Sequence, residues 1–120
     1  MIIAIVQIPL DGPKRPREAV MAQSLESTKI FHNVKGLRRK YYLNSDDGGG
    51  GVYEFATRAD AEAWFNDEWE DWMEGRFGVR PILTIFDNPV VLDNETGEVR
   101  VDGTLVPALG KQQSDKYSGQ

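Results

Sequence analysis

One histidine has the side chain best suited to acid–base chemistry in this chain. His32 is the only histidine, and histidine is the side chain whose ordinary pKa lies closest to neutral pH. A base of this kind can take a proton from a bound substrate. The alternative is that His32 is a surface cation at the end of a helix, where the helix dipole favours positive charge.

A second informative group is an aromatic stripe on one predicted helix. Thr57 can cap this helix at its start, and the helical pattern continues to about Arg76. The apolar face repeats at three- and four-residue intervals and consists of Ala61, Trp64, Phe65, Trp69, Trp72 and Met73. One interpretation is that these side chains fill the core. The other is that they leave a slot in which a planar ligand stacks on the rings.

The composition excludes several classes of protein. The chain has 120 residues, enough for one ordinary domain, and it has no cysteine, so disulfides and thiolate chemistry are excluded. With a single histidine, a multi-histidine metal site cannot form within one chain, and we expect no metal. The net charge of -5 argues against nucleic-acid binding. No apolar run is long enough to span a bilayer and no signal peptide is evident, so we expect a cytoplasmic protein.

Alternating and helical patterns predict six main elements in an α+β order. Strands are predicted at residues 2–8, 37–43, 52–56 and 80–86, and helices at residues 17–32 and 57–76. This is the order of the ferredoxin-like βαββαβ fold, a four-stranded antiparallel sheet with two helices on one face. The domain is expected over residues 1–93, followed by a hairpin or arm at 94–110 and a disordered tail at 111–120.

The first predicted strand also suggests a partner subunit. Residues 2–8 are apolar at both alternating sets of positions, a pattern typical of a strand that is buried on both faces. In a chain of this size the two helices can cover only one face. We therefore expect the other face to pack against a second copy of the chain, which makes a homodimer.

Three further features are interpreted as structural. Gly48–Gly51 is predicted to belong to the polar, glycine-rich connection between two strands. It is not interpreted as a phosphate loop, because it lacks the Gly-x-x-x-x-Gly-Lys-Ser/Thr pattern. Lys40 is interpreted as the partner of Glu54 in an ion pair rather than as an anion-binding residue. The acidic residues within 67–74 are interpreted as a solvated helix face.

Several short motifs resemble the YdhR-type monooxygenase family of the dimeric α/β-barrel superfamily. They are Gly36-Leu37, Lys40, the run from Gly50 to Phe55 (Gly-Gly-Val-Tyr-Glu-Phe), Ala61 and Phe86-Asp87, in that order. The resemblance spans residues 1–93 and implies two ferredoxin-like subunits that pair sheet to sheet. It also implies a cofactor-independent oxygenase that acts on a hydrophobic aromatic molecule. The glycine run and the extension beyond residue 93 are less typical of the family.

The resemblance supplies no catalytic residues, but the chemistry that it implies suggests roles for the candidate residues. A cofactor-free oxygenase needs a base that ionises a phenolic substrate, so that the anion reacts directly with O2, and His32 can be that base. The hydroxyls of Tyr41 and Tyr53 can bind the oxyanion, which completes the candidate catalytic set. The ligand pocket is expected between the sheet and the helices, and its candidate residues are Phe31, Asn33, Tyr42, Trp64, Phe65, Trp69 and Trp72.

Two other functions use the same fold. The main alternative is a small-molecule-binding or stress-response barrel that performs no catalysis. Haem degradation, which occurs in other barrels of this superfamily, is disfavoured because His32 is the only histidine available as an axial ligand. The resemblance therefore predicts a monooxygenase, and the alternative predicts binding without turnover.

Overall fold

The computed structural model describes residues 1–110, which form an α+β protein with two compact units. The first unit is Met1–Asn88, and the second begins at Pro89. The tail that we expected to be disordered, residues 111–120, lies outside the described residues. Within residues 1–110, no helix combines the length and the apolar character needed to cross a membrane.

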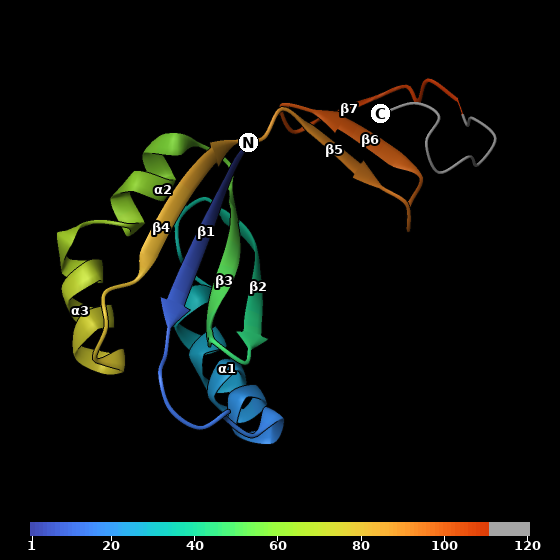
Figure 1. Cartoon of the computed structure of the whole chain (residues 1–120). Helices are drawn as coiled ribbons and strands as arrows, with labels where there is room; N and C mark the ends of the chain where they lie inside the picture. The colour runs from blue at the N-terminus through green and yellow to red at the C-terminus, as the bar shows by residue number, and fades with distance from the viewer. Residues whose placement is uncertain (111–120) are drawn as a thin grey trace. The chain divides into compact units, whose positions relative to one another are not determined.

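The first unit contains a four-stranded sheet and three helices. The strands are β1 (Ile2–Pro9), β2 (Leu37–Ser45), β3 (Gly48–Phe55) and β4 (Ile82–Asp87). The helices are α1 (Arg17–Phe31), α2 (Arg58–Trp64) and α3 (Asp67–Phe77). Every strand pairing is antiparallel, and the strand order is β2-β3-β1-β4. Figure 1 shows α1 on the β2 side of this sheet and α3 on the β4 side.

The hydrophobic core lies on one face of the sheet. Side chains alternate along a strand, and every second residue of β1 is buried while the residues between are more exposed. The buried core consists of Ile2, Ala4, Val6, Ile8, Tyr53, Phe55, Ala61, Trp69 and Met73. Phe55 is fully buried, and burial of a side chain of this size contributes about 1.5–3 kcal/mol. Helix α1 has no buried residue, so it is the least firmly packed helix of the unit.

The opposite face of the sheet carries exposed apolar side chains. On the outer strands, Tyr41 is 56% exposed and Phe86 is 49% exposed. Leu43 and Ile82 are similarly exposed on the same two strands. Between them, Ile3 and Ile5 of β1 are only partly covered. We call this surface the open face.

The glycine run is part of a strand, so the prediction that it forms a connection was wrong. β3 begins at Gly48, and only Asp46 and Asp47 separate it from β2. At Gly50 the backbone has a φ of +153°, and an added Cβ would collide with the backbone oxygen of Val6 on β1. Glycine is therefore required because β1 and β3 pair in a conformation that other residues rarely adopt.

Gly50→Ala is expected to lower the free energy of unfolding by about 2 kcal/mol or more, because it adds backbone strain inside the sheet. The matched control is Gly75→Ala in α3, where an added Cβ meets nothing within 4 Å. In a helix this change is expected to stabilise the protein by up to about 1 kcal/mol. Urea denaturation of both variants measures the two effects. Equal effects at the two positions would contradict this description of β3.

The predicted aromatic helix is divided in two, which corrects the expectation of one helix over residues 57–76. Phe65 leaves the helical region with φ -85° and ψ 62°, and Asn66 caps the next helix by accepting a hydrogen bond from the Trp69 amide at 2.9 Å. Asparagine favours this position because its side chain satisfies a free amide at the helix start. The predicted caps are confirmed: Thr57 accepts from the Asp60 amide at 3.1 Å, and Gly78 ends α3 in a left-handed conformation.

The second unit contains a three-stranded antiparallel sheet. Its strands are β5 (Val90–Asp93), β6 (Glu98–Val101) and β7 (Thr104–Val106). The first two form the predicted hairpin, in which Leu92 lies opposite Val99. The third strand was not anticipated. β5 lies within the range 1–93 that was expected for the first domain, yet it belongs to the second unit, together with its strand partner β6.

Candidate functional site

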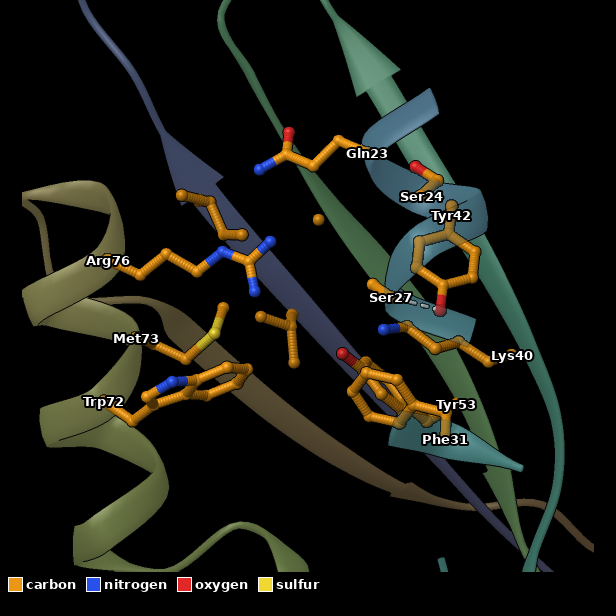
Figure 2. Close-up of a pocket in the computed structure, with 13 residues that line it drawn as sticks. Gln23, Ser24, Ser27, Phe31, Lys40, Tyr42, Tyr53, Trp72, Met73 and Arg76 are labelled. Carbon is orange, nitrogen blue, oxygen red and sulfur yellow. Dashed lines mark hydrogen bonds between the residues drawn. The ribbon is translucent and has the colours of Figure 1, made fainter. Parts of the chain in front are cut away.

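A cavity of about 80 Å³ lies between α1, α3 and the core face of the sheet. We call it the central cavity. It is lined by Val6, Ile8, Gln23, Ser24, Ser27, Phe31, Lys40, Tyr42, Gly50, Tyr53, Trp72, Met73 and Arg76. Figure 2 shows α3 with Trp72, Met73 and Arg76 on one side of this cavity, and α1 with Gln23, Ser24 and Ser27 on the other. The cavity lies where the sequence predicted a pocket, between sheet and helices.

Lys40 brings an amine into this cavity. Its strand position opposite Tyr53 turns the side chain toward the helices, and Figure 2 shows the amine pointing into the cavity. The amine nitrogen lies 3.4 Å from the ring centre of Phe31, 4.0 Å from that of Tyr42 and 4.7 Å from that of Tyr53. A cation above an aromatic face is attracted by the π electrons of the ring. Aromatic rings thus take the place of a carboxylate beside this amine.

The expected ion pair between Lys40 and Glu54 is wrong. Glu54 is paired with Arg39, with 3.5 Å between the charged atoms, because these two residues are opposite each other in the register. Lys40 is one residue further along β2 and therefore points to the other face. Within residues 1–110, Lys40 forms no ion pair.

The surroundings of the Lys40 amine favour its neutral form. Burial, and secondarily the positive charge of Arg76, lower the pKa of Lys40 to about 7. Arg76 reaches the cavity from α3, and its guanidinium carbon lies 5.5 Å from the ring centre of Trp72. In the described part of the chain, Arg76 also has no ion pair with a carboxylate. The central cavity therefore contains two cationic groups without a counter-charge.

Of the three tyrosines among the candidate site residues, two line the central cavity and one lies elsewhere. The Tyr42 hydroxyl hydrogen-bonds to the Ser27 hydroxyl at 2.8 Å, which links β2 to α1 (Figure 2). Tyr53 is only 3% exposed, and burial, with a smaller effect of Tyr42, raises its pKa well above the ordinary value of 10. The Tyr53 phenol is therefore protonated at neutral pH and able to donate a hydrogen bond to a ligand. Tyr41 is on the open face and is not brought together with Tyr53.

His32 does not line the central cavity. It is exposed, directly after the end of α1, where its backbone amide donates to the Thr28 oxygen at 3.1 Å. It borders a depression of about 220 Å³ beside β2, which shares Phe31, Lys40 and Tyr42 with the central cavity. Asn33, the next residue, is also exposed and lies outside the central cavity. The predicted histidine base therefore borders a neighbouring depression and does not line the aromatic cavity itself.

The aromatic stripe divides between core and cavity. Trp69 is 4% exposed, and Phe65 packs against it edge to face with ring centres 4.8 Å apart. Trp64 contacts Phe31 in a similar geometry at 5.3 Å. Trp72 is 42% exposed and is the one tryptophan that lines the central cavity. Most of the predicted aromatic slot is therefore core packing, and only Trp72 among the tryptophans offers a ring to a ligand.

Several cavity residues were not anticipated from the sequence. Arg76 follows Trp72 by four positions, which places both on one side of a helix. On α1, Ser24 and Ser27 interrupt the apolar stripe at a three-residue interval, and they line the cavity instead of filling it. On β3, Gly50 lines the cavity without a side chain. These small polar or absent side chains explain why space remains beneath α1.

Comparison with known proteins gives no family assignment. No model of a known protein family matches the chain, and no curated protein matches it. Function must therefore be argued from the cavity itself, and above all from the unpaired cations within it.

Proposed function

We propose that the first unit is a ferredoxin-like subunit that pairs with a second copy through the open face, as in the dimeric barrels that the sequence resembles. The strand order β2-β3-β1-β4 supports the fold. The exposed apolar side chains on the open face support the pairing, because large contiguous apolar patches on soluble proteins mark interaction sites. In this arrangement the central cavity stays on the helix side of each subunit.

We propose that the central cavity binds a small planar aromatic molecule with an acidic hydroxyl group and that the protein oxidises it with O2, without a prosthetic group. The observation that carries this proposal is an unpaired amine surrounded by aromatic rings. Burying a charge without a partner is costly, so such a group is kept where function requires it. The rings of Phe31, Tyr53 and Trp72 match the planar part of the ligand, and the cations match its ionised oxygen.

Lys40 takes the role of base that the sequence had suggested for His32. With a pKa of about 7, a large fraction of the amine is neutral at physiological pH and can take the phenolic proton. The ammonium formed and Arg76 then stabilise the phenolate. For an anthrone-type substrate, O2 reacts at the activated ring carbon. That carbon loses two hydrogens and gains one oxygen atom as a carbonyl, and the second oxygen atom leaves as water.

We infer that α1 shifts outward when the cavity accommodates a larger ligand. A volume of about 80 Å³ is smaller than the cavity of about 150 Å³ that accommodates benzene in a protein core. Because α1 has no buried residue, a small outward shift exposes little apolar surface. We therefore assign α1 as the element that adapts to ligands of different size.

The pair of Lys40 and Arg76 also favours a second candidate function, binding without turnover. Two cations can hold the carboxylate of an aromatic acid, which needs no base to become ionised. This candidate shares the ligand class and the cavity with the first. It differs only in the absence of a reaction with O2.

The two candidates are separated by O2 consumption with a panel of anthrones and hydroquinones, together with calorimetric titration of aromatic acids. We expect turnover by the wild type and a loss of at least 100-fold in Lys40→Met. His32→Ala is expected to change turnover by less than twofold, since its side chain lies outside the cavity. Lys35→Met controls for loss of a lysine, because that side chain is 93% exposed.

Each other outcome has a defined meaning. Turnover that survives Lys40→Met but not His32→Ala would overturn the assignment of the base. Binding of aromatic acids without O2 consumption would establish the second candidate. Neither binding nor turnover with any member of the panel would contradict both.

A further inference from the structure

We propose that Lys40 is also a nucleophile, which captures small aromatic aldehydes in the central cavity as a covalent imine. This activity uses the same cavity as the proposed function but a different reaction. It needs neither O2 nor a phenolic group on the ligand. Either proposal can therefore fail while the other stands.

The Lys40 amine is surrounded by aromatic rings and is open to the cavity on one side. Three aromatic rings lie within 5 Å of the Lys40 nitrogen, at 3.4, 4.0 and 4.7 Å from their centres. The nitrogen borders open cavity volume, so a carbonyl carbon can approach it. No carboxylate in residues 1–110 forms an ion pair that would hold this amine in its charged form. A lysine becomes nucleophilic where its surroundings are apolar or already cationic, and both conditions hold here.

None of the residues that line the cavity is a carboxylate, and the one other cation among them opposes protonation of the Lys40 amine. Arg76 on α3 opposes protonation, and burial does so more strongly. Burial raises the pKa of Tyr53 on β3 well above its usual range, so its phenol is neutral at this pH. Helix α1 contributes only uncharged groups to this cavity. An ordinary lysine has about one neutral amine in three thousand at pH 7, whereas Lys40 is neutral in a large fraction of molecules.

The reaction balances without any other reagent. The amine nitrogen attacks the carbonyl carbon and forms a carbinolamine. The carbinolamine then loses its hydroxyl and the remaining amine hydrogen as water, which leaves a carbon–nitrogen double bond. The hydrogen-bonded hydroxyls of Ser27 and Tyr42 line the same cavity and are available for the proton transfers.

The cavity also defines the class of aldehyde. The exposed ring of Trp72 and that of Phe31 favour a planar molecule with one ring. Arg76 enters from the opposite side and favours an anionic substituent away from the reacting carbon (Figure 2). Aromatic aldehydes with a carboxylate or an acidic hydroxyl are thus preferred over uncharged ones.

The test uses the full chain, 4-carboxybenzaldehyde and a borohydride reductant at pH 7 without O2, with peptide mapping by mass spectrometry. We expect Lys40 to be labelled at least tenfold faster than Lys35 and Lys29, which are exposed. Labelling of Lys40 should saturate with aldehyde concentration, whereas labelling of the Met1 amine should rise linearly. Benzaldehyde without the carboxylate should react at Lys40 at least tenfold more slowly.

Two further measurements keep the test independent of variant folding. Unreactive 4-carboxybenzoic acid methyl ester should slow the labelling of Lys40 and leave Lys35 unaffected. Lys40→Arg should abolish the saturable adduct, and circular dichroism shows whether that variant is folded. Uniform labelling of all exposed amines, or an unlabelled Lys40 in the wild type, would overturn the proposal whatever the outcome of the O2 experiments.

Discussion

Lys40→Met is expected to stabilise the protein at pH 6, by about 1–2 kcal/mol in the free energy of unfolding. At this pH the native state must hold a charged amine among aromatic rings, with Arg76 nearby and no ion-pair partner in the described chain. Methionine has a similar length and no charge, so it removes this penalty and keeps the packing. The magnitude is well below the full value of the pKa shift, because solvent still reaches part of Lys40.

The effect of Lys40→Met on the free energy of unfolding should depend on pH. The pKa of Lys40 is lowered from 10.5 in the unfolded chain to about 7 in the native protein. Between these values the unfolded state binds more protons, so the wild type gains stability as the pH rises from 7 toward 10.5. The advantage of Lys40→Met should therefore be largest below pH 7 and shrink toward pH 10.

Urea denaturation at pH 6 and pH 9.5 measures both effects. The matched control is Lys35→Met, which removes an exposed lysine and should change stability by less than about 0.5 kcal/mol at either pH. A Lys40→Met variant that is less stable than the wild type at pH 6 would mean that the amine has a stabilising partner. Stability gained by loss of a proposed functional group is the trade-off expected of an active site.

Phe86→Lys is expected to weaken dimerisation by at least 100-fold, or about 2.7 kcal/mol. Phe86 is on β4 opposite Ile3, and its ring is 49% exposed on the open face. In the proposed dimer this ring is buried against the partner subunit, so a lysine there replaces an apolar contact with a buried charge. Sedimentation velocity at micromolar concentrations measures the change in mass.

The matched control for this surface is Leu25→Lys on α1. Leu25 is 68% exposed, on a helix that packs against the other side of the sheet, and its change should leave the dimer intact. A wild type that sediments as a monomer would contradict the pairing directly. Dissociation by Leu25→Lys but not by Phe86→Lys would move the interface to α1.

The strong local patterns made most of the elements predictable. The β-branched run at the start of the chain, the Thr57 cap and the Gly78 stop all act through nearby backbone geometry, and each is where it was expected. The α+β class and the antiparallel four-stranded sheet follow from these elements. The glycine run was misjudged because glycine is rare in strands for reasons of entropy, and only the contact with the Val6 oxygen requires it here.

The candidate site was less predictable because it depends on which way side chains point. Lys40 and Arg39 are neighbours in sequence, and a bulge in β2 shifts the register before Arg39, so a pattern of residue types could not decide which of them meets Glu54. The separation of His32 from the cavity depends on where α1 ends relative to the sheet. Asn66, whose capping role starts a second helix in the middle of the aromatic stripe, separates Trp64 from Trp69 and Trp72.

The central claim is that Lys40 is a half-buried amine, without an ion-pair partner in residues 1–110, that meets the acidic group of an aromatic ligand. Heteronuclear NMR of ¹³C-labelled protein measures it directly, through the pH titration of the Lys40 Cε signal with and without 2-naphthoate. The account predicts a pKa of about 7 for the free protein and a rise of at least one unit with ligand, because a bound anion stabilises the protonated amine. A Lys40 pKa above 10 that is unchanged by the ligand would contradict it.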